Sequence, residues 1–317
     1  PLHSNDSVRD ILTTSAQAFS EWRKLPISTR CAHIAQLTLL LRNNKDYYAS
    51  LITQEMGKPV NESRIEIEKC AKACEYYASE AAHILADEAH LVEGNNSFIH
   101  HEPLGAVLAI MPWNFPFWQV MRFAVPAIAA GNVVLLKHAP NVGLCALAIE
   151  KMFLDAGFPP GILQNLFVDI SQLDAVVAHN TVQAVTFTGS EHAGAQVAML
   201  AGKHIKKTVL ELGGSDAFIV LADADIAKAA EVAAQSRMRN AGQSCIAAKR
   251  FIVVRDAKDE FMHHFVKHVS AFVPADPMLQ ETIMGPLARI DLAEKLSAQR
   301  QASIDKGAHV VMDGQCN

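Results

Sequence analysis

The chain has 317 residues, with 28 Lys or Arg against 33 Asp or Glu, so its formal net charge is −5 when the histidines are neutral. Hydrophobic residues make up 50% of the chain and charged residues 19%, which excludes a disordered or fibrous class. The acidic balance, without a long run of Lys and Arg, argues against nucleic acid or an anionic membrane as a partner. At roughly 100 to 200 residues per domain, the length predicts two domains.

The cysteines are scattered along the chain, and none lies in a CxxC pattern: Cys31, Cys70, Cys74, Cys145, Cys245 and Cys316. A chain of this size does not need disulfides to fold, so we expect reduced thiols and a cytoplasmic setting. The N-terminal residues have neither the basic nor the apolar segment of a secretory signal. The most apolar stretch, residues 104–136, is interrupted by polar residues and prolines, so we expect it to be buried core and not a membrane span.

Helices are predicted along the first 90 residues, because Leu, Ile and Ala recur at spacings of three and four over 6–22, 28–55 and 62–85. From residue 92 the period falls to about two, as in a strand. The strands that we expect from there are 98–101, 107–110, 132–136, 162–168 and 184–188. A helix is expected over 142–156, and another begins after Ser190.

A second set of elements follows the apolar strand at 208–210: strand 217–221, helix 225–238, strand 251–254 and helix 258–272. Short apolar strands that alternate with helices predict an α/β fold with a parallel sheet covered on both faces. Gly213 and Gly214 allow a sharp change of direction near the expected domain boundary. We therefore expect one domain over 1–211 and a second over 212–317.

Cys245 stands apart from the other cysteines, because the segment Asn240–Cys245 is small, polar and flexible and follows a helix. A thiol there is accessible to a substrate and to backbone N–H donors, although exposed loop cysteines without a role also occur. Glu211 lies at the end of an apolar strand beside two glycines. Its carboxylate is either a paired structural charge or a general base in a cleft.

Three further segments have the residue types of a binding site. Asn114, between Pro112 and Pro116, can direct its amide at an oxyanion, or it can satisfy its own backbone in a turn. Gly189 and Ser190 lead from a strand into a helix, whose N–H groups and dipole can hold a pyrophosphate. Lys137 ends a strand, where its ammonium can contact a ribose or phosphate oxygen, or simply be exposed to solvent.

Taken together and in this order, these segments resemble the aldehyde dehydrogenase superfamily. The segments that carry the resemblance are Pro112–Pro116, Lys137, Phe187–Ser190, Glu211–Gly214 and Gly242–Cys245. The resemblance implies a Rossmann-like cofactor domain and a second α/β catalytic domain. It also implies site roles: Cys245 as nucleophile, Glu211 as activator of water, Asn114 for the oxyanion, Trp113 and Lys137 for the nucleotide, Gly189 and Ser190 for the pyrophosphate.

The cofactor that the resemblance implies is NAD or NADP, without a metal. Many NAD-preferring members have a glutamate three residues after the lysine that matches Lys137, where this chain has Pro140. Because a missing carboxylate removes a repulsion against a 2′-phosphate, we expect NADP to be tolerated or preferred. The histidines at 263, 264 and 268 lie on one predicted helix without further ligands at metal-binding spacing.

The substrate class follows from a closer resemblance to the succinate-semialdehyde dehydrogenases. Members of that group bind the substrate carboxylate with two arginines, and Arg122 and Arg239 stand at the matching positions. The resemblance therefore implies oxidation of a carboxylated aldehyde to the acid through a cysteine thiohemiacetal and thioester. The alternatives are a broad-specificity aliphatic aldehyde dehydrogenase, in which Arg239 is merely solvated, and a truncated nucleotide-binding protein without catalysis.

The chain departs from the family at its C-terminus, since members continue beyond the position of Asn317 with a Glu-x-Phe-Gly-Pro motif and a terminal strand. We therefore expect the catalytic domain to be C-terminally incomplete. By the same resemblance, residues 92–102 form an arm whose exposed strand pairs with another subunit, because an unpaired strand edge favours association. A homo-oligomer, either a dimer or a tetramer, is expected.

Overall fold

The computed structural model describes residues 2–92 and 94–314. The chain forms two compact units, one of Pro1–Glu55 with Ser63–Gly213 and one of Met56–Glu62 with Gly214–Asn317. The division between Gly213 and Gly214 lies next to the boundary expected after residue 211. The sequence does not predict that 56–62 joins the second unit. Cys316 and residue 93 of the expected arm lie outside the described residues.

The first unit begins with helices that cover its sheet: α1 (Asn5–Trp22), α2 (Ile27–Asn43), α3 (Lys45–Met56) and α4 (Val60–Ile84). The single helix predicted over 28–55 is wrong, because the chain leaves the helical conformation at Asn44, where φ is −108° and ψ is 21°. The Asn44 side-chain amide donates to the Leu40 carbonyl at 3.0 Å, a bond that ends a helix locally.

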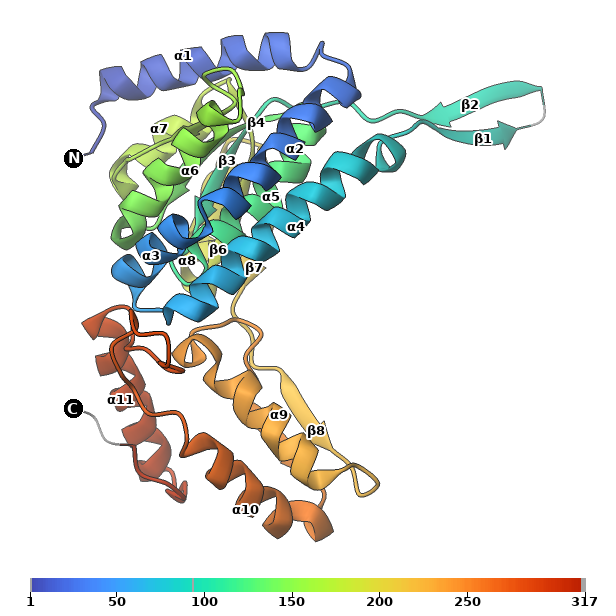
Figure 1. Ribbon diagram of the computed structural model, residues 1–317. Coiled ribbons are helices and arrows are strands. Elements are labelled where there is room, and N and C mark those ends of the chain that lie inside the picture. The colour runs from blue at the N-terminus through green and yellow to red at the C-terminus, as the bar shows by residue number, and fades with distance from the viewer. Residues whose placement is uncertain (1, 93, 315–317) are drawn as a thin grey trace. The chain divides into compact units, whose positions relative to one another are not determined.

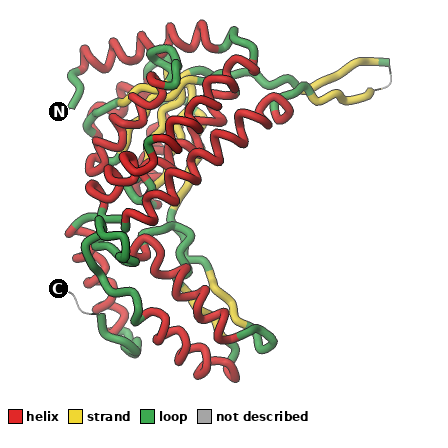
Figure 2. The backbone as a smooth tube through the Cα atoms, in the orientation of Figure 1, coloured by secondary structure: helices red, strands yellow, loops and turns green. Residues whose placement is uncertain are grey.

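An antiparallel hairpin follows, made of β1 (Glu88–Val92) and β2 (Asn95–Ile99), with Glu88 opposite Ile99. The expected strand over 98–101 therefore starts and ends earlier than predicted. Figure 2 shows the two strands leaving the helices of the first unit as a separate ribbon. Phe98 on this hairpin is 63% exposed and Ile99 is 47% exposed.

The core of the first unit is a five-stranded sheet in the order β5-β4-β3-β6-β7. Its strands are β3 (Ala106–Met111), β4 (Val133–His138), β5 (Leu163–Asn165), β6 (Val182–Gly189) and β7 (Lys207–Leu212). Every pair is parallel, which confirms the predicted sheet. The strand predicted over 162–168 is shorter: it ends at Asn165, which bonds Glu150 and the Ala146 carbonyl on the preceding helix.

Helices connect the strands: α5 (Pro116–Ala129), α6 (Gly143–Asp155), α7 (Leu173–Ala178) and α8 (Glu191–Lys203), with short 3₁₀ turns η1 (Pro140–Val142) and η2 (Ile170–Gln172). α5 and α6 pack against each other and on β4, whereas α7 and α8 pack against each other and on β6. Figure 1 shows the sheet in the middle of this unit with helices around it. α5 comes from the most apolar stretch, where burial on nearly all sides hides a helical stripe from the sequence.

The strand order reverses between β3 and β6. The chain runs outward from β3 to β4 and β5, then returns to β6 on the other side of β3 and ends at β7. In open α/β sheets, ligands bind outside the carboxyl ends of the strands at such a reversal. The segments after Met111 and Gly189 occupy that position in this sheet.

β7 is more exposed to solvent than its apolar sequence leads one to expect. The strand that carries Glu211 is apolar in sequence, but it lies at the sheet edge and most of its side chains are exposed. α8 packs closely on it, since a Cβ at Gly194 would lie 2.5 Å from the Leu212 Cδ2 atom. Glycine at 194 therefore sets the distance between helix and sheet, as expected for a packing residue.

The second unit has its own α/β core. Strands β8 (Ala217–Val220) and β9 (Arg250–Val253) are parallel, and the chain between them forms α9 (Ile226–Met238) and η3 (Arg239–Gly242). η4 (Arg255–Ala257), α10 (Lys258–Val269) and α11 (Ile290–Asp305) follow. α10 ends three residues before the predicted 272, and α11 is not anticipated by the sequence analysis. Val220, Ala230 and Phe261 lie at the centre of this core, with Phe218, Phe251 and Phe265 packed against it.

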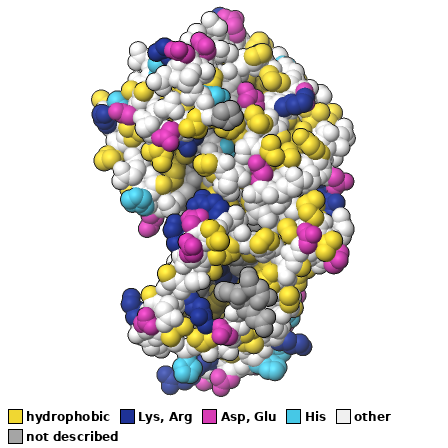
Figure 3. Space-filling model, turned by 90° about the vertical axis from the view of Figure 1, so that its left-hand side faces the viewer, with side chains coloured by type: hydrophobic (Ala, Val, Ile, Leu, Met, Phe, Trp, Pro, Cys, Tyr) yellow, Lys and Arg dark blue, Asp and Glu magenta, His cyan; other side chains and the backbone are white. Residues whose placement is uncertain are grey.

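The surface carries side chains of both charges, as the composition of the chain leads one to expect. Figure 3 shows acidic, basic and hydrophobic side chains interspersed on the face it draws. No described helix combines the length and the apolar character that crossing a bilayer requires. Within 2–92 and 94–314 the cysteines form no disulfide, and four of them are buried while Cys245 is half-buried.

Candidate active site

The carboxyl edge of the first unit's sheet brings several predicted residues into register. Ile110 of β3 pairs with Lys137 of β4 on one side and with Phe187 of β6 on the other. One strand further, Thr188 pairs with Glu211. Lys137, Gly189 and Glu211 therefore lie at the same edge, on both sides of the point where the strand order reverses.

The segment that carries Trp113 and Asn114 joins β3 to α5, and both side chains are half-buried. Its far end is held by Glu66 of α4, a side chain that is only 4% exposed. One Glu66 carboxylate oxygen accepts the N–H groups of Phe117 at 2.9 Å and Trp118 at 3.0 Å. A carboxylate at the start of α5 is also favoured by the helix dipole. The backbone after Asn114 is thus fixed by a residue distant in sequence.

His138 holds the same segment from the sheet. Its Nε2 lies 2.9 Å from the Pro116 carbonyl oxygen, and its Nδ1 lies 2.9 Å from the Ala139 nitrogen. Burial lowers the pKa of this ring to about 4, so His138 is neutral. Nε2–H therefore donates to Pro116, while Nδ1 accepts from Ala139. His138 belongs to none of the family motifs, and the sequence signal for it is its position directly after Lys137, at the end of a strand.

Arg122 and Glu211 are brought together by the fold. Arg122 Nη2 lies 3.4 Å from Glu211 Oε2 and donates to Thr188 Oγ1 at 3.5 Å. The Arg122 side chain is 31% exposed and that of Glu211 is 56% exposed, so the pair is open to solvent and to a substrate. The predicted carboxylate ligand and the predicted general base are therefore neighbours. Thr188 is a further member of this cluster that sequence reasoning did not assign.

The groups predicted to hold the cofactor fit a dinucleotide. Lys137 is half-buried, and burial lowers its pKa, an effect that the nearby Asp169 carboxylate partly offsets. Ser190 caps α8 by accepting the Ala193 N–H at 3.3 Å, and it is exposed at the start of a 13-residue helix. Pro140 is exposed at the start of η1. A cation and an open helix N-terminus at one sheet edge suit the phosphates of NAD(P).

Cys245 lies in the second unit, at the end of residues 239–245, which we call the cysteine loop. Cys245 is half-buried, and its carbonyl oxygen accepts from Lys249 Nζ at 2.8 Å. The loop has a left-handed backbone at Asn240 (φ 52°), Ala241 (φ 52°) and Gly242 (φ 75°). For the two residues with a Cβ, this conformation costs roughly 1–2 kcal/mol each. Such strain persists only where surrounding contacts enforce it.

The arginines beside the loop have different environments. Arg239 is exposed at the end of α9, an exposure that agrees with the solvated alternative as well as with a substrate role. Arg237 is half-buried, and burial lowers its pKa. Its guanidinium packs on the loop, since a Cβ at Gly242 would lie 2.5 Å from Arg237 Nη2. The structure therefore places Arg237 against the cysteine loop, a contact that the sequence analysis did not predict.

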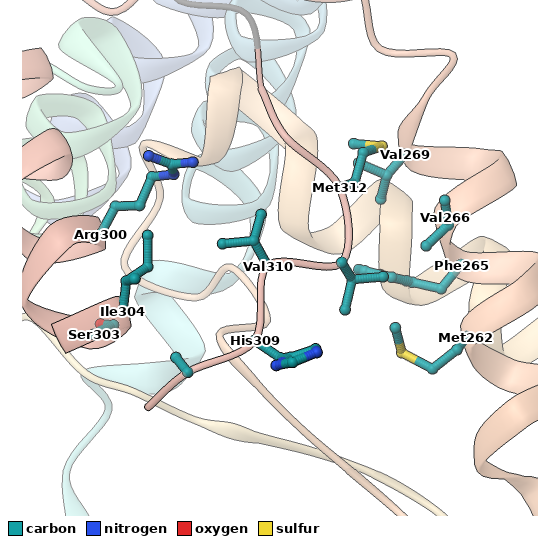
Figure 4. Close-up of a pocket in the computed structure, with 12 residues that line it drawn as sticks. Met262, Phe265, Val266, Val269, Arg300, Ser303, Ile304, His309, Val310 and Met312 are labelled. Carbon is teal, nitrogen blue, oxygen red and sulfur yellow. The ribbon is translucent and has the colours of Figure 1, made fainter. Parts of the chain in front are cut away.

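The predicted site residues divide between the units. Trp113, Asn114, Arg122, Lys137, Gly189, Ser190 and Glu211 belong to the first unit, and Arg239 and Cys245 to the second. An apolar pocket in the second unit is separate from this set. Figure 4 shows α10 side chains such as Phe265 on one side of residues 309–312 and α11 side chains such as Ile304 on the other. No residue of the predicted site lines it. Among the described residues, no group of His, Cys, Asp and Glu could hold a metal ion.

Comparison with known proteins identifies the family of this chain. The family model described as "Aldehyde dehydrogenase family" matches residues 1–317. A probable succinate-semialdehyde dehydrogenase [NADP(+)] of Synechocystis sp. is 47% identical over 313 residues, which are 99% of this chain and 69% of that protein. The succinate semialdehyde dehydrogenase [NAD(P)+] Sad of Escherichia coli (strain K12) is 43% identical over 315 residues, with coverage of 99% and 68%.

A solved structure is similar throughout the chain. The succinic semialdehyde dehydrogenase from Streptococcus pyogenes, determined in complex with NADP+, has a TM-score of 0.98 and 36% identity. The match covers 100% of this chain and 70% of that one. This chain therefore spans about two thirds of the length of the relatives that it matches.

The neutral state of His138 predicts a loss of stability in mild acid. Its pKa of about 4 lies below the ordinary 6.5, so the unfolded chain binds the proton first as the pH falls. Protonation of His138 alone should lower the free energy of unfolding by about 3 kcal/mol as the pH falls from 6.5 to 4. Below pH 4 the contribution of His138 should be constant. Urea unfolding across this pH range measures it.

The control is His138→Gln, which keeps an N–H donor for the Pro116 carbonyl and cannot titrate. Other groups titrate equally in both proteins, so the difference between the two curves isolates His138. If the curves run parallel from pH 6.5 to 4, His138 is not buried as a neutral ring.

Proposed function

This chain belongs to the aldehyde dehydrogenase family, and we propose that it oxidises succinate semialdehyde to the corresponding dicarboxylic acid with NAD(P). NAD(P)-dependent aldehyde oxidation is the reaction class of its relatives, three of which are named above as succinate-semialdehyde dehydrogenases. The observation that carries the proposed substrate is the Arg122 guanidinium at the carboxyl edge of the sheet, beside Glu211.

In the proposed reaction, Cys245 is the nucleophile. Its thiolate adds to the aldehyde carbon, and the resulting oxyanion accepts hydrogen bonds from the Asn114 amide and the Cys245 N–H. Because the thiolate is the reactive form of a cysteine, the thiol has to lose its proton for this step. NAD(P)+, when bound, would supply the oxidising power by accepting the hydride that the cysteine adduct has to lose to become a thioester. The protein's contribution is to hold the oxyanion donors and the thiol in place.

Glu211 completes the cycle by acting as a general base. Its carboxylate takes a proton from a water molecule, whose oxygen attacks the thioester carbon and releases the acid and the Cys245 thiolate. The 56% exposure of the Glu211 side chain supports this role, because water reaches the carboxylate. A base for water has no use in a reductase that starts from an activated acyl group, which makes oxidation the favoured direction.

Substrate choice is proposed to come from Arg122 and Arg239. A guanidinium binds a carboxylate through two parallel, charge-assisted hydrogen bonds. Both observed contacts of Arg122 use Nη2, and the group has further donors at Nε and Nη1. The exposure of Arg239 leaves its guanidinium accessible to a substrate carboxylate. The two arginines together would favour an aldehyde with an ω-carboxylate.

A comparison of two aldehydes tests the proposed substrate and nucleophile. We expect kcat/KM for succinate semialdehyde to exceed that for butanal by about 100-fold or more, because hydrogen bonds to charged groups contribute about 1.5–3 kcal/mol each. Cys245→Ala should abolish formation of reduced cofactor with both aldehydes. Absorbance of the reduced nicotinamide measures each rate, with NAD and with NADP.

The matched control is Cys31→Ala, which removes a buried thiol of α2 and should leave kcat/KM unchanged. Equal kcat/KM for the two aldehydes would favour the broad-specificity aliphatic enzyme. Folded protein that binds NADP but turns over neither aldehyde would favour the nucleotide-binding alternative.

We propose that NADP is accepted at least as well as NAD. Pro140 is exposed where the family's NAD-preferring members have a glutamate, so no carboxylate at this position repels a 2′-phosphate. The nearby Asp169 carboxylate is engaged elsewhere, since it accepts the Ser171 N–H at 2.9 Å and caps η2. The negative charge of Asp169 is thereby held at the start of η2.

A single substitution tests the role of Pro140. Pro140→Glu should lower the ratio of kcat/KM with NADP to kcat/KM with NAD by about tenfold or more, which corresponds to about 1.4 kcal/mol. Pro140→Gln is the matched control, because it has the same length without the charge. Equal ratios in both variants would mean that charge at position 140 does not select the cofactor.

We also propose a homo-oligomer, a dimer or tetramer, that uses the β1–β2 hairpin. Both strands have an open edge, and Phe98 is 63% exposed on the hairpin. Unpaired edges and exposed aromatic side chains favour association with another chain.

Sedimentation tests this proposal. The unmodified chain should sediment as a dimer or tetramer, and Phe98→Asp should shift it toward the monomer, because a charge in an apolar contact is costly. Ile170→Asp is the control, since Ile170 is 79% exposed in the first unit outside the hairpin. A monomeric unmodified chain would contradict the proposed role of the hairpin.

A further inference from the structure

The cysteine loop needs an external support. Asn240, Ala241 and Gly242 have consecutive left-handed conformations, and only the last is a glycine. Residues with a Cβ adopt this region at a cost in free energy, so the loop is not the conformation that its sequence prefers by itself. Asn240 is nevertheless 1% exposed and well inside the second unit. Some contact has to hold it there.

Contacts inside the loop account for part of that support. The Asn240 carbonyl accepts from the Gln243 N–H at 3.0 Å and from Gln243 Nε2 at 3.1 Å. Asn240 Nδ2 donates back to the Gln243 carbonyl at 3.3 Å. Gln243 Oε1 in turn accepts the Ala288 N–H at 3.0 Å. These bonds close the turn between 240 and 243, but they do not engage the main-chain N–H at which the left-handed run begins.

Glu62 supplies that contact. The Asn240 N–H donates to Glu62 Oε2 at 3.0 Å, across 178 residues of sequence. Glu62 is half-buried in the first turn of α4 and belongs to the same compact unit as the cysteine loop. A bond from an N–H to a carboxylate is shorter and stronger than one between neutral groups. It anchors the first residue of the strained run from a rigid helix.

We propose that Glu62 is a positioning residue for the nucleophile of the proposed reaction. By holding Asn240 in the left-handed region, it fixes the path of the backbone through Gly242 to Cys245. The Cys245 thiol and N–H, which would attack the aldehyde and hold the oxyanion, then need no rearrangement before reaction. The proposed role of Glu62 is exerted through its hydrogen bond with the Asn240 N–H. The inference rests on the proposed function for the role of Cys245, but not for the anchoring of the loop.

Two substitutions separate the acceptor from the charge. Glu62→Ala removes the acceptor, whereas Glu62→Gln keeps a carbonyl oxygen that can accept the Asn240 N–H. We expect hydrogen exchange of the amides from Asn240 to Cys245 to become about tenfold faster or more in Glu62→Ala, and to stay within about twofold in Glu62→Gln. Peptide-resolved exchange followed by mass spectrometry measures this without cofactor or turnover.

Steady-state kinetics with succinate semialdehyde and NADP give the second readout. We expect kcat to fall about tenfold or more in Glu62→Ala, while KM stays within about threefold, and Glu62→Gln should restore most of kcat. Glu75→Ala is the matched control: it is on the same helix, removes only a surface ion pair with Arg42, and should change neither readout.

Exchange in Glu62→Ala that equals that of the unmodified chain would overturn the proposal, as would a raised KM with unchanged kcat. An unmodified chain that turns over no aldehyde would contradict the proposed function. The exchange comparison would still decide whether Glu62 anchors the cysteine loop.

Discussion

Glutamate carboxylates that accept main-chain N–H groups from distant segments are the interaction on which the candidate site depends. The helices α5 and α6 begin at the carboxyl edge of the sheet, and the residues that precede them, Phe115 and Val142, cannot cap them. Glu66 caps α5 in their place, and Glu55 of α3 accepts the N–H groups of Leu144 at 2.7 Å and Cys145 at 2.8 Å. Orphan N–H groups at helix starts are thereby satisfied through tertiary contacts.

This arrangement couples the site to the helical layer. The segment with Asn114 lies directly before α5, and Pro140 lies directly before α6, so both depend on carboxylates that α3 and α4 deliver. Loss of the Glu66 carboxylate leaves the buried Phe117 N–H without this acceptor, at a cost of about 1–3 kcal/mol. His138 adds a neutral donor from the sheet side. The backbone at the expected oxyanion and nucleotide positions is therefore set by hydrogen bonds from residues distant in sequence, not by local turn preference.

The sequence predicts what local pattern and motif order encode, and little else. Periodicity locates α1 and α4, and alternation of strands with helices predicts the parallel sheet. It fails at α5, which is apolar on nearly every side, and at Asn44, where one side-chain bond divides a helix. The edge position of β7 was missed because apolar residues such as Val209, 62% exposed, look buried in a sequence.

The site residues show the same limit. The family motifs direct attention to Glu211, Asn114 and Cys245, whose roles stay predictions. The contacts that hold them are invisible in sequence, because 51 residues separate Glu66 from Phe117 and 178 separate Glu62 from Asn240. Arg122 illustrates the gain from structure: eight residues from Asn114 in sequence, it contacts Thr188 and Glu211 across the sheet edge.

The Arg122–Glu211 contact also constrains how a charged substrate can enter. A substrate carboxylate beside Glu211 would meet like-charge repulsion if the guanidinium were absent, since two carboxylates in one site disfavour each other. Arg122 has donors in a planar fork, so it can lie between Glu211 and a second carboxylate and bind both. A neutral aldehyde leaves the existing ion pair as it is and gains nothing from the arginine. On the proposed mechanism, the positive charge of Arg122 offsets the negative charge of the Glu211 carboxylate. The same arginine therefore distinguishes a carboxylated aldehyde from a neutral one.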